Sequence, residues 1–196
     1  MKQNAPLLLA CLGLLCCCLP ASAQKAAAAS PSEPPTKTQT LCAANEEPVF
    51  ACTLQGRRRK MVALCAAPVQ GSAQEDKTWR FRYLFGRPGQ IELSYPASGA
   101  GSSADAFTFT RLIYAGDTGG YARTFTNEGY RYILYSVSGR DVERAGLLVQ
   151  REGQMRALRD MECVQSTFTT TQNSALSPIR WKVDPDIDAH GLPSTR

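Results

Sequence analysis

The chain contains a single histidine, His190, and it lies near the carboxyl end between Ala189 and Gly191. Hydrolases that use a serine or cysteine nucleophile need a histidine base that packed neighbours hold in place. The surrounding residues predict an exposed tail instead, so His190 is a poor catalytic candidate. The two Gly-rich stretches at 98–105 and 115–123 also lack a P-loop lysine and a following helix. The sequence therefore indicates a non-enzymatic protein with no cofactor.

The sequence also lacks the residue patterns that are typical of metal sites. Zinc usually requires closely spaced cysteine pairs, and no such pair follows residue 23. The stretch Asp184, Asp186 and Asp188 is similar to the first half of a calcium loop. Its sixth position is Ala189, where the turn needs glycine, and Thr195 stands where a bidentate glutamate belongs. We therefore predict no metal.

Long apolar runs are absent after the first 23 residues, so no transmembrane segment is predicted. Residues 1–23 open with Met-Lys, continue through an apolar stretch, and end in Ala21-Ser22-Ala23, which is typical of a signal peptide. We expect a periplasmic or secreted protein. A lipoprotein signal ending at Cys11 is the weaker alternative, because only about six residues before it are available for an apolar core, which normally needs 7 to 15.

The formal net charge of +5 includes one lysine of the predicted signal, which leaves +4 on the exported chain. This mild excess is not the strongly clustered basic face of a nucleic-acid-binding protein. We therefore expect no nucleic-acid partner.

Three further regions are predicted after the signal. Residues 24–40 are rich in Ala, Pro, Ser and Thr and contain no large apolar residue, which predicts a disordered tether. Residues 41–163 form one β-domain, and residues 164–196 form a loosely attached tail.

The dominant hydrophobic period within 41–163 is two. In the clearest case Trp79, Phe81, Tyr83 and Phe85 alternate with Arg80 and Arg82. The predicted strands are 48–54, 60–66, 78–86, 90–95, 106–114, 121–126, 130–137, 145–151 and 155–161. We expect an all-β fold, a single antiparallel meander of about eight or nine strands closed as a barrel or a sandwich and containing disulfides.

An even number of cysteines remains after the signal, and in an oxidising compartment this predicts two disulfides. The four are Cys42, Cys52, Cys65 and Cys163. An opposed register of the first two strands pairs Cys52 with Cys65 and leaves Cys42 for Cys163. The alternative, Cys42 with Cys52 and Cys65 with Cys163, remains open.

Between Cys52 and Cys65 lie four consecutive cations: Arg57, Arg58, Arg59 and Lys60. A charged loop of this kind is usually a solvated turn. The alternative is a basic hairpin that contacts an anionic envelope surface of lipid or glycan.

The cysteines, together with Phe50-Ala51-Cys52, Tyr83-Leu84-Phe85-Gly86 and Tyr95-Pro96, resemble a family of secreted bacterial β-proteins with no assigned activity. This resemblance implies a compact exported β-domain and supplies no catalytic residues.

A second resemblance rests on Thr118-Gly119-Gly120-Tyr121. It is similar to the Ser-Gly-x-Tyr loop with which periplasmic lysozyme inhibitors enter the lysozyme cleft, with Thr in place of Ser. The resemblance implies that this loop binds a lysozyme or another secreted or envelope protein, and that Arg123 or Arg111 adds a charge-assisted hydrogen bond to a catalytic carboxylate. We therefore expect an exported binding domain that inhibits lysozyme, and the basic hairpin is the alternative.

Overall fold

The structure of the protein is a computed structural model, and the residues it describes are 39–56, 58–69, 78–97, 101, 103–171, 174–176 and 179–195. The chain divides into two units, Met1–Thr36 and Lys37–Arg196. The predicted signal peptide, Cys11 and most of the predicted tether lie outside the described residues. All that follows concerns the second unit.

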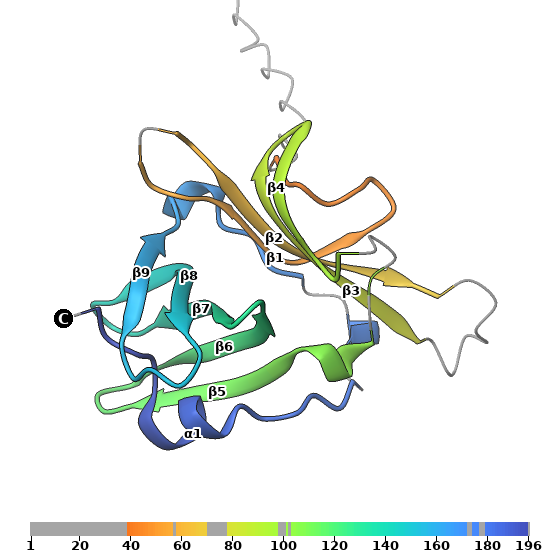
Figure 1. The fold of residues 1–196 in the computed structure, drawn as a ribbon. Helices are drawn as coiled ribbons and strands as arrows, with labels where there is room; N and C mark the ends of the chain where they lie inside the picture. The colour runs from red at the N-terminus through yellow and green to blue at the C-terminus, as the bar shows by residue number, and fades with distance from the viewer. Residues whose placement is uncertain are drawn as a thin grey trace, which may run out of the picture. The chain divides into compact units, whose positions relative to one another are not determined.

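Two antiparallel sheets make up most of this unit (Figure 1). The first sheet, in the order β1-β2-β3-β4, consists of β1 (Glu47–Thr53), β2 (Met61–Pro68), β3 (Trp79–Arg87) and β4 (Gln90–Tyr95). The second, in the order β5-β6-β7-β8-β9, consists of β5 (Thr108–Tyr114), β6 (Thr118–Asn127), β7 (Tyr130–Ser138), β8 (Glu143–Arg151) and β9 (Ala157–Glu162). The described helices are η1 (Ala104–Ala106), η2 (Gln165–Thr167), η3 (Ser174–Leu176) and α1 (Pro185–His190).

Each predicted strand overlaps one of these nine strands, so the prediction of a mainly β, antiparallel fold is confirmed. The single meander, however, is divided into two sheets. The first sheet ends at Tyr95, because Pro96 lacks the N–H that a further ladder bond requires. The described residues form no closed barrel.

The two sheets share one hydrophobic core. Phe50 and Tyr83 of the first sheet are buried in the same cluster as Phe125, Leu134 and Leu147 of the second. The ring centroids of Tyr83 and Phe125 lie 4.6 Å apart. Burial of each large apolar side chain contributes about 1.5–3 kcal/mol. One face of the five-stranded sheet therefore packs against the first sheet.

The other face of the five-stranded sheet is covered by the end of the chain. Ile187 of α1 is 2% exposed and packs with Ile133 and Leu148. The helix begins at Pro185 because the side chain of Asp184 accepts hydrogen bonds from the backbone N–H groups of residues 186 and 187. Both faces of this sheet are therefore buried, against different partners.

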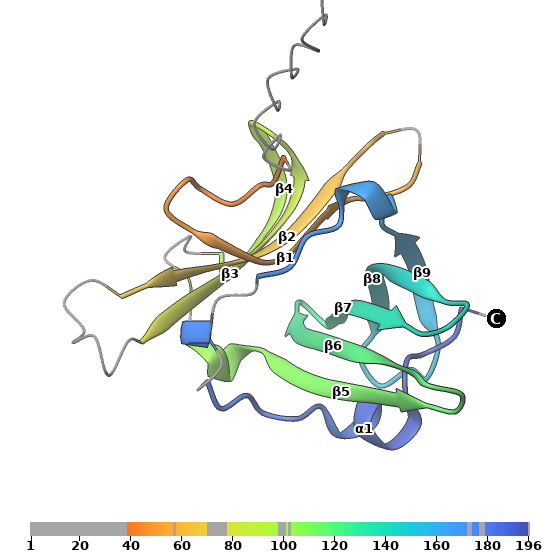
Figure 2. The same ribbon diagram turned by 180° about the vertical axis from the view of Figure 1, so that it is seen from behind.

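The predicted loose attachment of residues 164–196 is wrong for the described part of that segment. Thr169 and Ala51 exchange backbone hydrogen bonds of 2.9 Å, and the rings of Phe168 and Phe50 lie 5.1 Å apart. Figures 1 and 2 show the blue carboxyl-terminal segment passing along β1, then along β5, and through α1 toward β9. The segment packs because its apolar side chains complete the core that the strands leave open.

The disulfides join Cys42 to Cys65 and Cys52 to Cys163, so two disulfides are confirmed but both predicted pairings are wrong. The β1–β2 ladder pairs Cys52 with Val62 rather than with Cys65. This odd shift of register places Cys52 and Cys65 on opposite faces of the sheet. Cys52 faces the shared core and meets Cys163, whereas Cys65 faces the side on which Cys42 packs.

Candidate functional site

The predicted binding loop, Thr118 to Tyr121, lies within strand β6. The turn that precedes it occupies residues 115–117, because Tyr114 and Thr118 already form a ladder pair. At Gly120 a Cβ atom would lie 1.9 Å from the carbonyl oxygen of Ser136 on β7. Glycine is therefore required here for strand packing, and the motif does not form a projecting loop.

Tyr121 points toward the shared core instead of outward. Its hydroxyl donates to Oγ1 of Thr170 at 3.5 Å, and that hydroxyl in turn donates to the carbonyl oxygen of Val49 at 2.9 Å. Burial raises the pKa of Tyr121 more than its bond to Thr170 and the charge of Arg123 lower it. Tyr121 is thus a neutral, packed ring that supports its neighbours.

Arg123 lies two residues further along β6 on the same face and is surrounded by aromatic rings. Its Cζ atom is 4.5 Å from the ring centroid of Trp181, 4.8 Å from that of Phe109 and 5.8 Å from that of Tyr121. These rings come from β5, β6 and the carboxyl-terminal segment. Aromatic faces attract a cation, so the arrangement holds a positive charge among apolar groups.

The guanidinium of Arg123 has no protein hydrogen-bond acceptor within the described part of the chain. Its Nε and Nη1 atoms are buried without a partner. Burial lowers the pKa of Arg123 to about 10, against a smaller raising effect of Tyr121, so the group stays cationic at neutral pH. Buried charges in proteins are normally paired and hydrogen-bonded. An exception of this kind marks Arg123 as a candidate binding group.

Arg123 lines a cavity of about 390 Å³. Its described lining consists of Arg123 and five apolar residues: Phe109, Leu176, Ile179, Trp181 and Val183. Arg123 is thus the one charged group that lines it among the described residues.

The opposite face of the same sheet carries a second arginine, Arg131 of β7, whose environment is very different. Its guanidinium forms an ion pair with both oxygens of Asp184 and donates to Asp186 at 3.0 Å. Thr124 Oγ1 donates to Asp184 Oδ2 at 2.7 Å. Burial alone would raise the pKa of Asp184, but hydrogen bonds from Arg131, Thr124 and the N–H of Ile187 outweigh it and lower the pKa. This network anchors α1.

A cavity of about 770 Å³ lies beside this anchor and is lined by Arg131, Gln150, Asp184 and the exposed His190, among others. The Nδ1 atom of His190 is 3.2 Å from the carbonyl oxygen of Asp186. The three acidic residues that resemble a calcium loop therefore lie in and around α1, and two of them already bind Arg131.

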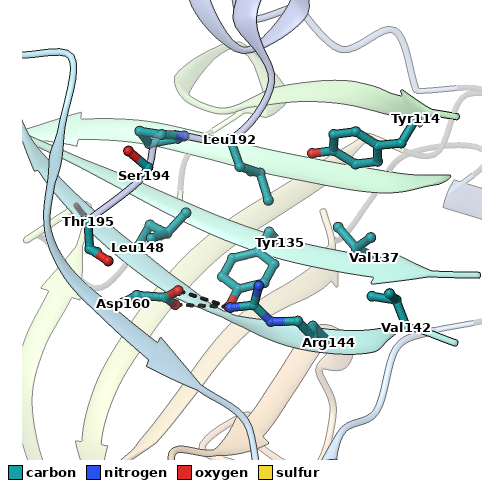
Figure 3. Close-up of a pocket in the computed structure, with 11 residues that line it drawn as sticks. Tyr114, Tyr135, Val137, Val142, Arg144, Leu148, Asp160, Leu192, Ser194 and Thr195 are labelled. Atoms are coloured by element: carbon teal, nitrogen blue, oxygen red, sulfur yellow. Dashed lines mark hydrogen bonds and ion pairs between the residues drawn. The ribbon is translucent and has the colours of Figure 1, made fainter. Parts of the chain in front are cut away.

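A further cavity, of about 470 Å³, lies between strands β7 to β9 and residues 192–195 (Figure 3). The hydroxyl of Tyr135 donates to Asp160 Oδ1 at 2.9 Å, and Arg144 donates to Oδ2 of the same carboxylate at 3.2 Å. Burial, and then the hydrogen bond and charge of Asp160, raise the pKa of Tyr135. Arg144 also pairs with Glu162. These groups satisfy one another, in contrast to Arg123.

The predicted basic hairpin is only partly retained. Arg58 and Arg59 are exposed between β1 and β2, whereas Arg57 lies outside the described residues. Lys60 is not free, because its ammonium group pairs with Glu92. Arg87 of the neighbouring hairpin joins the two exposed arginines, since its Nε donates to the carbonyl oxygen of Arg58 at 3.2 Å.

One group of three potential metal ligands occurs among the described residues: Cys42, Glu46 and Cys65. The two sulfurs are bonded to each other, and both oxygens of Glu46 accept hydrogen bonds of 2.8 Å from Arg82. These side chains therefore already form a disulfide and hydrogen bonds that stabilise the fold.

Sequence reasoning named Arg123 and Tyr121 but missed Phe109, Trp181 and the Arg131–Asp184 pair. The sequence does contain a pattern that indicates that Trp181 faces the core. Ile179, Trp181 and Val183 alternate with two cations, Arg180 and Lys182, which is the period of an extended segment with one apolar face. Arg111, the other predicted donor, is exposed on β5.

No protein-family model, curated protein or solved structure matches the chain. The two resemblances therefore stay predictions from the sequence. Within the described ranges no helix has the length and apolar character needed to cross a membrane.

Proposed function

We propose that the protein is an exported domain that binds an anionic ligand at Arg123. The observation that carries the proposal is the buried guanidinium that aromatic rings surround and that no described protein acceptor satisfies. A hydrogen bond to a charged group contributes about 1.5–3 kcal/mol. A cation–π contact contributes about 0.5–2 kcal/mol. An anion that reaches Arg123 therefore gains an interaction that the rings do not supply.

Export is supported by the signal-like first 23 residues and by the two disulfides, which are typical of oxidising compartments. Inhibition of a lysozyme stays a prediction from the sequence. The position of residues 118–121 within β6 gives no support to a loop that enters a cleft.

The test uses an NMR titration of the purified, oxidised full chain with sodium acetate, sulfate and phosphate at constant ionic strength. The signals to follow are the side-chain N–H of Arg123 and the indole N–H of Trp181. We expect saturable shifts in the wild type with at least one anion. Arg123→Met should abolish them, and Arg123→Lys, which keeps the charge but loses the planar fork, should weaken them.

The matched control is Arg140→Met, which removes one exposed cation from the loop between β7 and β8. This variant should titrate like the wild type. Saturation that persists in Arg123→Met, or an absence of saturation with all three anions, would contradict the proposal.

We also propose, as a second candidate function, that the exposed arginines at 58, 59 and 87 contact an anionic envelope surface. The observation that favours it is the junction of two neighbouring hairpins through the Arg87–Arg58 hydrogen bond. Three arginines at one end of the sheet attract an anionic lipid or glycan, and salt screens that attraction over a Debye length of about 8 Å.

The test of this candidate is sedimentation with vesicles that contain anionic phosphatidylglycerol. Changing the three arginines to Gln should reduce binding, and the binding of the wild type should fall steeply with added salt. The matched control carries Gln at the exposed Arg140, Arg156 and Arg159, which removes the same net charge elsewhere. Equal loss in both triple variants would show a nonspecific charge effect and would refute a hairpin site.

A further inference from the structure

We infer that the ligand of Arg123 is a monocarboxylate attached to an apolar group. This inference rests on the proposed anion site and specifies its chemistry. It follows from three properties of the cavity: the number of charged donors, the character of its walls and the character of its mouth.

The first property is the number of donors. Arg123 is the one charged residue among the described lining residues, and the other five are Phe, Leu, Ile, Trp and Val. A phosphate or sulfate has four oxygens and usually carries two negative charges, so most of its oxygens would face hydrocarbon. Each polar group buried without a partner is costly. A carboxylate has only two oxygens and a single charge.

The second property is shape. The planar fork of a guanidinium matches the two oxygens of a carboxylate. The rings of Phe109 and Trp181 lie within 4.8 Å of Cζ of Arg123. The Cζ atom lies over the faces of these rings, and its donors, which lie in the plane of the guanidinium, have no acceptor among the described residues. This geometry favours a flat anion over a tetrahedral one.

The third property is the mouth of the cavity. Val183 lines it and is 54% exposed, and the apolar side chains of Leu176 and Ile179 line it as well. These side chains offer contact to an apolar group that is attached to the carboxylate. The exposed Arg180 and Lys182 flank Trp181 in the sequence and add positive potential that attracts anions.

The experiment compares the affinities of acetate, hexanoate and inorganic phosphate for the purified full chain by calorimetry and the NMR titration. Each buried methylene strengthens binding about fourfold, so two buried methylenes make hexanoate at least tenfold tighter than acetate. We expect this order, with phosphate weakest. Val183→Ser, a change at an exposed position, should weaken hexanoate severalfold and leave acetate unchanged.

Two further probes distinguish the source of the carboxylate. N-acetylleucine represents the carboxyl terminus of a peptide, and N-acetylleucinamide is its uncharged control. Binding of N-acetylleucine as tight as that of hexanoate, without binding of the amide, supports a chain-terminal carboxylate. Tenfold weaker binding supports a free apolar acid, and either result supports the inferred class.

Results that contradict the inference can be distinguished from results that contradict the proposed anion site. If phosphate binds at Arg123 as tightly as hexanoate, the inference is overturned and the anion site stands. If hexanoate binds no tighter than acetate, the apolar part of the inference is overturned. If no anion saturates the Arg123 signals, or Arg123→Met binds hexanoate like the wild type, both the inference and the proposed function fail.

Discussion

The two faces of the five-stranded sheet each hold a partly buried arginine, and the two arginines have opposite surroundings. Arg131 meets two carboxylates, and its main partner Asp184 is 4% exposed. Arg123 meets three aromatic rings and no described acceptor. Removing one partner of a buried pair is strongly destabilising, whereas replacing a buried charge and its environment by apolar groups is often neutral. Arg131 therefore has the surroundings of a stabilising ion pair, whereas Arg123 has the surroundings on which the proposed anion site rests.

The carboxyl-terminal segment contacts both faces of the five-stranded sheet. The segment begins at the disulfide between Cys52 and Cys163. Further along, the ring of Trp181 lies over Arg123, and the carboxylate of Asp184 pairs with Arg131. The wall of the proposed site thus depends on the two anchors that flank it. Variants that release an anchor should therefore affect both faces, whereas variants at Arg123 should affect one.

The largest effect is expected from the disulfide that anchors the start of the segment. Chain entropy predicts a loss of about 5 kcal/mol for Cys52→Ala with Cys163→Ala, whose separation is 111 residues, and about 3.5 kcal/mol for Cys42→Ala with Cys65→Ala, whose separation is 23. Urea unfolding measures both. Equal losses would show that loop length does not govern them. Non-reducing peptide mapping should first recover the two observed pairs.

The next largest effect is expected from the anchor at the other end. Asp184→Ala removes the partner of Arg131 and the cap of α1, and we expect a loss of about 3 kcal/mol or more in the free energy of unfolding. Asp188→Ala, an exposed change within the same helix, should cost less than about 0.5 kcal/mol. Similar losses in the two variants would contradict the anchoring role.

The contrast between the arginines predicts opposite responses to the same substitution. Arg131→Met leaves Asp184 buried without its partner and should cost about 3 kcal/mol. Arg123→Met leaves no carboxylate behind and keeps an apolar side chain among the rings, so stability should stay within about 1 kcal/mol of the wild type or rise. Thermal unfolding checks both. A severe loss in Arg123→Met would make that arginine a structural residue.

The smallest effect is a pH dependence confined to one face. The pKa of Asp184 is lowered in the folded state, so its ionised form stabilises the fold above the unfolded pKa of about 3.9. That contribution is lost as the pH falls from about 4 through the folded pKa. The stability difference between wild type and Asp184→Asn should therefore shrink on acidification from pH 5. The difference between wild type and Arg123→Met should not change, since Arg123 is cationic throughout.

The strands were predictable because each depends on local alternation. In β3 the buried Phe81 and Tyr83 alternate with Arg80 and Arg82, and this period requires no knowledge of the partner strand. The β6–β7 turn at Glu128-Gly129 is likewise local, because positive φ values of 51° and 76° suit a two-residue hairpin turn. Arg123 was predicted as a donor from the resemblance of the neighbouring residues 118–121 to an inhibitor loop, and no local pattern predicted the rings that surround it.

The β-structure, the number of disulfides and the positions of most strands could be predicted from the sequence, because they follow from the period of apolar residues and from the number of cysteines. Which cysteines bond to each other, and which side chains surround each arginine, depends on the tertiary structure. A shift of the β1–β2 register by an odd number of residues reversed the face of Cys65 relative to Cys52 and so changed both disulfides. Likewise, Trp181 and Arg123 are 58 positions apart, and Asp184 and Arg131 are 53 apart. Contacts over such separations depend on the packing of the whole chain, which no local pattern encodes.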